Sequence, residues 1–211
     1  DDLFIPRAKV SKLDPYFQII AKSPTHSAAR NVINEIMPHF FDVDGNFVQQ
    51  FQTTGFDSRL WELYLFCYFN EEGLQINREH FAPDFLLSSG DSEVSVEAVI
   101  VSNKNLQEIC RNIPTREDII KEQKFMPAKW GSSLYSKLTH KDKNGTHYWE
   151  YQHTKEKPFV IAIADFHNTC SMTWSQGSLI TYLYGFEYDH FFDSNGNLIV
   201  KPIKVTTHPK G

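Results

Sequence analysis

The chain has 211 residues and a formal net charge of -5, and 41% of its residues are hydrophobic. This composition is typical of a globular protein, and the negative charge argues against a protein that coats nucleic acid by bulk charge. The longest apolar run, LWELYLFCYF, is too short to span a bilayer and contains a glutamate, so we expect no membrane partner. The three cysteines form no CxxC pair, which supports neither a zinc knuckle nor a disulfide framework and predicts a cytoplasmic protein.

The first third of the chain carries mixed signals. Residues 1–24 contain three prolines and little periodicity, which predicts an N-terminal arm with at most a short strand or turn. The stretch SPTHSAARNVINEIMPHF predicts a helix that ends near Pro38, because Ala28, Val32 and Ile36 recur at helical spacing. The stretch FVQQFQTTG is compatible with either a short helix or an extended linker.

A helix followed by three strands is predicted next. Residues 60–69 are apolar on nearly every face, which predicts a helix buried between layers. Asp57 or Ser58 is the expected N-cap, and Gly73 is the expected end of the helix. The segments LQIN, PDFLLSSG and EVSVEAVIVS are expected strands, and the Gly-Asp of SSGDSE predicts a hairpin turn between the last two.

The second half alternates helices and strands. NLQEICRNI, TREDIIKEQKF and WGSSLYSKLTHK are predicted helices, the second with a capping-box start and the third with Leu134, Tyr135 and Leu138 inward. PFVIAIADF predicts a central strand covered on both faces, and SQGSLITYLYG a helix capped by Ser175 and ended by Gly185. Residues 186–211 predict a C-terminal hairpin with an Asn-Gly turn. The order predicts one α/β domain over 1–211, with a mixed central sheet flanked by helices.

Three carboxylates lie among apolar residues of the predicted helix and strands, at Glu62, Asp84 and Glu97. Burying a carboxylate is costly unless it is paired, protonated or bound to a metal. Asp84 and Glu97 can meet across neighbouring strands, and a hard cation such as Mg²⁺ would relieve their repulsion. Other interpretations stay open: Glu62 pairs with Arg59, Asp84 caps a turn, and Glu97 belongs to a solvated polar face of its strand.

These residues resemble the PD-(D/E)xK nuclease superfamily, whose core has the same helix, three-strand, helix, strand order. The likeness rests on Glu62 in a helix, Pro83-Asp84 opening a strand and Glu97 in the next strand. It implies a restriction-endonuclease-like core over residues 56–185, with Asp84, Glu97 and Glu62 binding Mg²⁺ or Mn²⁺. A wider likeness, to bacterial proteins of uncharacterised function, covers most of the chain and implies no activity.

The sequence departs from the family pattern at one position. The family pattern has a lysine two residues after the second acid, taken to orient or activate the attacking water, but Val99 stands there. Lys137 is the preferred substitute, because a helix packed on the sheet could aim its ammonium at the acids; Lys104 and Gln123 are weaker candidates. Without such a residue, the site would be weak or inactive.

Other residues allow weaker hypotheses. Asp165 and His167 end an apolar strand, where a structural histidine is the default interpretation, and Cys170 lies nearby as a conceivable nucleophile. Tyr148, Trp149 and Tyr151 could stack on bases, although burial is the default for aromatic residues. Lysines are frequent in the middle of this acidic chain: Lys121, Lys124, Lys129, Lys137, Lys141 and Lys143. They could form a phosphate-binding patch or an ordinary solvated surface.

Together these features predict a metal-dependent nuclease that hydrolyses phosphodiester bonds, with DNA favoured over RNA by the resemblance alone. Asp84, Glu97, Glu62 and Lys137 are its predicted catalytic residues. The alternative is a catalytically degenerate nuclease fold that binds nucleic acid or serves protein assembly. A homodimer, or fused domains beyond the chain ends, would fit the assembly interpretation.

Overall fold

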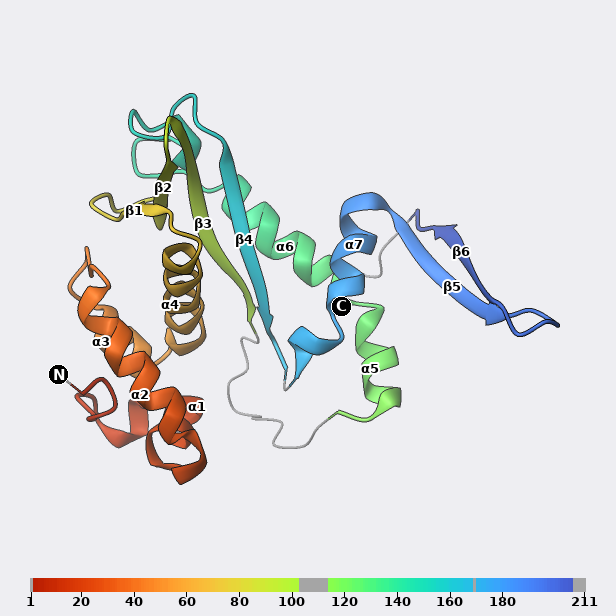
Figure 1. The fold of residues 1–211 in the computed structure, drawn as a ribbon, viewed down its shortest axis with the longest axis horizontal. Helices are drawn as coiled ribbons and strands as arrows, with labels where there is room; N and C mark the ends of the chain where they lie inside the picture. Colours follow the sequence, from red (N-terminus) through yellow and green to blue (C-terminus); the bar gives the residue numbers. More distant parts are fainter. Residues whose placement is uncertain (1, 103–113, 169, 207–211) are drawn as a thin grey trace. The chain divides into compact units, whose positions relative to one another are not determined.

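A computed structural model describes residues 2–102, 114–168 and 170–206 (Figure 1). The chain divides into two compact units. The first comprises Asp1–Ile100 and Thr139–Ala164, and the second comprises Val101–Leu138 and Asp165–Gly211. The predicted helix NLQEICRNI, Lys104 and the end of the C-terminal hairpin lie outside the described residues.

The first unit begins with helices α1 (Pro15–Lys22), α2 (Ser27–Ile36) and α3 (Phe47–Gln52). The prediction of an irregular N-terminal arm is therefore wrong. Asp14 caps α1 by accepting hydrogen bonds from the N–H groups of Tyr16 and Phe17, and Pro15 suits the first helical position. The ambiguous FVQQFQ stretch is helical. Short 3-10 turns occupy Val10–Lys12, Pro24–His26, Met37–His39, Tyr148–Glu150 and Ser171–Thr173.

These helices surround a phenylalanine-rich core. The rings of Phe17, Phe47 and Phe51 are almost wholly excluded from solvent. Burial of each such side chain contributes about 1.5–3 kcal/mol, and their edge-to-face and stacked contacts add to that. Leu3 and Phe4 belong to the same core, so long-range packing orders a segment without local periodicity.

Helix α4 (Phe56–Glu71) connects this core to the sheet. Leu63 belongs to the phenylalanine-rich core, whereas Leu65 and Phe69 pack with sheet residues, as expected for a helix between layers. Gly73 ends the helix at φ +71°, as predicted. The predicted N-cap is wrong, because Gly55 occupies that position and makes no side-chain cap bond.

The sheet has the order β1-β2-β3-β4, and β1 (Gln75–Asn77), β2 (Phe85–Ser89) and β3 (Ser92–Ser102) are the three predicted strands. β1 pairs antiparallel with β2, and β2 pairs antiparallel with β3. Gly90 takes a positive φ in the predicted hairpin turn. β4 (Phe159–Phe166) lies beside β3 and points the same way in Figure 1, which makes the sheet mixed. The prediction of a central strand is wrong: β4 ends the strand order and is only partly buried.

The second unit contains α5 (Arg116–Gln123), α6 (Met126–Leu138), α7 (Gln176–Tyr184) and the hairpin of β5 (Phe186–Phe192) and β6 (Leu198–Lys204). The capping box on α5, the α7 end at Gly185 and the C-terminal hairpin are confirmed. Tyr135 and Leu138 are exposed, contrary to prediction, because Met126 and Trp130 occupy the buried side of α6. Ser175 stands at the N-cap of α7 but makes no side-chain cap bond. Among the described residues, no helix combines the length and apolar character needed to cross a membrane.

Candidate functional site

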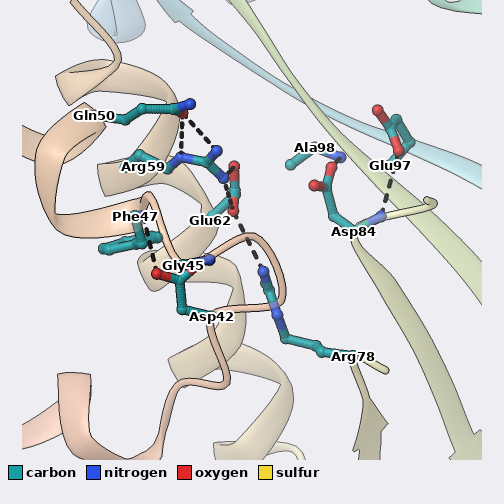
Figure 2. Close-up of polar contacts among 10 residues, drawn as sticks. All are labelled: Asp42, Gly45, Phe47, Gln50, Arg59, Glu62, Arg78, Asp84, Glu97 and Ala98. Atoms are coloured by element: carbon teal, nitrogen blue, oxygen red, sulfur yellow. Dashed lines mark hydrogen bonds and ion pairs between the residues drawn. The ribbon is translucent and has the colours of Figure 1, made fainter. Parts of the chain in front are cut away.

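Asp84 and Glu97 lie next to each other at the start of the β2–β3 ladder (Figure 2). Asp84 directly precedes β2, and the register pairs the following residue, Phe85, with Val96. The backbone N–H of Asp84 donates to Glu97 Oε2 at 3.3 Å, and the N–H of Ala98 donates to Asp84 Oδ2 at 2.8 Å. The predicted meeting of these two acids across the ladder is confirmed.

Glu97 lies inside the protein. Its exposed fraction is 3%, so the hypothesis of a solvated polar strand face is wrong. Ser95 on the same face is fully buried, and its N–H and Oγ both donate to the carbonyl of Pro158, at 2.9 and 3.0 Å. Val99 continues this face and is also buried. A carboxylate is thus held in a low-polarity layer, where its charge needs local compensation.

Glu62 of α4 faces the same site and is bound by two arginines (Figure 2). Arg59 Nη1 donates to both carboxylate oxygens at 2.8 and 2.9 Å, and Arg78 Nη2 lies 3.5 Å from Oε2. Arg59 is itself held by Gln50 Oε1, which accepts from its Nε and Nη2. The predicted Arg59–Glu62 pair is confirmed, and it coexists with proximity to the other acids.

The electrostatics of Glu62 link it to Asp84. The pKa of Glu62 is raised to about 7, because burial and then the charge of Asp84 raise it by more than Arg59 and Arg78 lower it. Burial and the negative charge of Asp84 together therefore disfavour the ionised carboxylate by more than the two arginines stabilise it. Glu62 therefore interacts electrostatically with Asp84, whose backbone N–H is in turn hydrogen-bonded to Glu97.

Arg78, which sequence reasoning missed, is the second cation that contacts Glu62. Its side chain is 9% exposed, and its guanidinium lies 3.9 Å from the Phe40 ring centroid and 4.7 Å from that of Phe85. Burial lowers the pKa of Arg78, while the charges of Glu62 and Asp84 raise it. A single arginine after a three-residue strand carries no periodic signal, so only the folded chain reveals its position.

The 151–153 segment borders the acid pair. His153 Nε2 donates to the carbonyl of Ala82 at 2.7 Å, and its ring stacks on His80 with centroids 3.8 Å apart. Burial, and then the charges of Asp142 and Glu97, raise the pKa of Tyr151. The local carbonyl bond and ring stacking hold the loop that leads into Asp84.

The donor chemistry of Asp84 and Glu97 fits a hard divalent cation. Both are carboxylates, and Mg²⁺ is commonly held by one or two carboxylates together with water and phosphate oxygens. Within the described residues, no group of three or more His, Cys, Asp or Glu side chains is arranged to hold a metal. These residues are therefore compatible with a metal site of two carboxylates, Asp84 and Glu97. Glu62 is paired with Arg59 instead.

The residues considered as substitutes for the motif lysine belong to the second unit or to the part of the chain that the structure does not describe. Lys137 is on α6 in the second unit, and its catalytic role stays a prediction. Gln123, at the end of α5, donates to the carbonyl of Trp174 at 3.2 Å in that same unit. Lys104 lies outside the described residues.

A second polar cluster, also noted from the sequence, forms within the second unit. His167 Nδ1 lies 2.7 Å from Asp165 Oδ1, and Nε2 lies 2.9 Å from Glu122 Oε2. Its side chain is 2% exposed, so the structural interpretation of this histidine is the one that the geometry supports. Cys170 is exposed. Both ring nitrogens of His167 already contact carboxylates, so His167 is not positioned to act as the base that would activate the Cys170 thiol.

Comparison with known protein families, curated proteins and solved structures finds no match for this chain. The geometry and chemistry of the site itself are therefore the structural observations that bear on its function.

Proposed function

We propose that this protein is a divalent-metal-dependent nuclease with a restriction-endonuclease-like core. The observation that carries the proposal is the pair formed by half-buried Asp84 and buried Glu97, joined by the 3.3 Å bond from the Asp84 N–H to Glu97 Oε2. The order α4, β1, β2, β3, α5, α6, β4 and the strand order β1-β2-β3-β4 support the core assignment. DNA is the favoured substrate on the family resemblance alone.

Asp84 and Glu97 would hold Mg²⁺ or Mn²⁺. When bound, such an ion polarises the phosphate and lowers the pKa of bound water. The chain's own contribution is orientation: the Ala98 N–H fixes Asp84 Oδ2, and the Asp84 N–H fixes Glu97 Oε2. Arg59 and Arg78, through Glu62, place positive charge beside two carboxylates that otherwise repel each other.

The test is cleavage of plasmid, single-stranded DNA and RNA in Mg²⁺ or Mn²⁺. The native chain is compared with an Asp84→Asn, Glu97→Gln double variant, whose side chains keep their size and lose their charge. We expect metal-dependent cleavage that falls at least about 100-fold in the double variant. Asp57→Asn, which replaces a half-buried carboxylate elsewhere in the first unit, serves as the matched control and should keep full activity. Cleavage that persists in the double variant would contradict the proposed site.

A second candidate is a catalytically degenerate nuclease fold that binds nucleic acid. It is favoured by Val99, which is 5% exposed and occupies the position of the motif lysine. In that case calorimetry would detect no Mn²⁺ binding, and Asp84→Asn would leave nucleic-acid binding unchanged or stronger. Binding without cleavage or metal affinity would therefore select the second candidate over the first.

A further inference from the structure

The loop between β1 and β2, residues 78–84, is fixed at both ends. At one end the Arg78 side chain is buried between Phe40 and Phe85 and pairs with Glu62. At the other end the carbonyl of Ala82 accepts the bond from His153, and Pro83 is fully buried. Ordinary surface loops lack such anchors, so this loop presents its middle residues from a defined backbone.

Phe81 projects from the middle of this anchored loop. Its exposed fraction is 77%, the largest of the large hydrophobic residues that the structure describes. The neighbouring imidazole of His80 stacks on His153 with an interplanar angle of 7°, so the ring before Phe81 is also held in place. The chain therefore presents an exposed aromatic ring three residues before Asp84.

We propose that Phe81 stacks on an unpaired nucleobase and that the substrate class of this site is single-stranded nucleic acid. This inference rests on the proposed nucleic-acid function. An aromatic ring accepts the face of any base, so the contact requires no particular sequence. Inside a duplex both base faces are already covered, and opening a step costs free energy, so the contact favours single strands. Exposed lysines of the same unit supply charge complementary to phosphate: Lys141, Lys143 and Lys155.

The test measures binding in EDTA, where a metal-dependent nuclease does not cut its substrate. The probes are a fluorescein-labelled 12-nucleotide oligo(dT) and a blunt duplex of the same length. We expect the native chain to bind the single strand more tightly, and Phe81→Ala to weaken that binding roughly 5- to 100-fold with little effect on the duplex. Phe81→Trp should retain the affinity.

Tyr184→Ala is the matched control, because Tyr184 is 72% exposed but belongs to the second unit. Tyr184→Ala should change the affinity for neither the single strand nor the duplex. Thermal unfolding should show that both alanine variants remain folded. Single-strand binding within twofold of native in Phe81→Ala, or no oligo(dT) binding by the native chain, would overturn the inference. If the native chain cleaves nucleic acid but Phe81→Ala binds oligo(dT) as well as the native chain does, only the stacking role is rejected. If Phe81→Ala loses oligo(dT) binding but the native chain cleaves no substrate, only the nuclease function is rejected.

Discussion

Two acid-containing clusters among the described residues, Asp84–Glu97 in the first unit and Asp165–His167 in the second, differ in the groups that bind their carboxylate oxygens. Peptide N–H groups orient Asp84 Oδ2 and Glu97 Oε2. In the second cluster one imidazole lies between the carboxylates of Asp165 and Glu122. Peptide donors orient a carboxylate without supplying a charge, whereas an imidazole can share a proton with its neighbours. Under the proposed function the first cluster binds a cation, whereas the contacts of His167 give the second a structural role.

The largest expected difference is in metal affinity. Isothermal titration with Mn²⁺ should show binding to the native chain that weakens at least about 100-fold in Asp84→Ala, Glu97→Ala, because both oxygen donors are removed. His167→Ala should bind Mn²⁺ as the native chain does. The reverse pattern, with affinity lost only in His167→Ala, would break the comparison.

Removing the imidazole of the second cluster should cost stability. His167→Ala leaves Asp165, whose side chain is 1% exposed, without its ring partner, so we expect a loss of about 3 kcal/mol in the free energy of unfolding. Urea denaturation measures the loss. His190→Ala, at an exposed position of β5 in the same unit, should change stability by less than about 0.5 kcal/mol. Equal effects of the two variants would argue against a structural His167.

Replacing Arg78 tests how much this cation stabilises the ionised carboxylate of Glu62. Arg78→Met should lower the free energy of unfolding by about 2 kcal/mol, because it removes a buried ion pair and two ring contacts. Since Arg78 lowers the pKa of Glu62, the same variant should raise that pKa above about 7. Carboxyl NMR titration measures the shift, and Arg78→Lys should show a smaller change. A lower Glu62 pKa in Arg78→Met would contradict this electrostatic account.

Asp57 gives the smallest expected effect and calibrates the cost of burial. Burial, and then the charge of Asp14, raise the pKa of Asp57 from 3.8 to about 6. The native chain therefore loses stability as Asp57 ionises between pH 4 and 6, because the folded state holds that proton more tightly than the unfolded state. Asp57→Asn should be more stable by about 1 kcal/mol at pH 7, after a discount for partial exposure, and equal to the native chain near pH 3.5. Thermal unfolding of both proteins at pH 7 and pH 3.5 measures this stability difference. A difference that is the same at both pH values would contradict the raised pKa of Asp57.

The elements with strong local signals could be predicted from the sequence. The turn at Gly90, the alternation of β3 and the Thr115–Asp118 capping box all formed as predicted, because neighbouring residues supply their hydrogen bonds and side-chain pattern. The same alternation brought Asp84 opposite Glu97, so this half of the site was predictable.

Tertiary structure decided the remainder, where the relevant partners are distant in the chain. Phe4 and Phe17 are buried by long-range packing that residues 1–24 do not encode as a periodic pattern. Trp61 donates to the carbonyl of Ala162, 101 residues away, and His153 donates to that of Ala82, 71 residues away. The burial of Arg78 against Phe40 and Phe85 likewise depends on packing, because no spacing rule relates a loop arginine to rings on other segments.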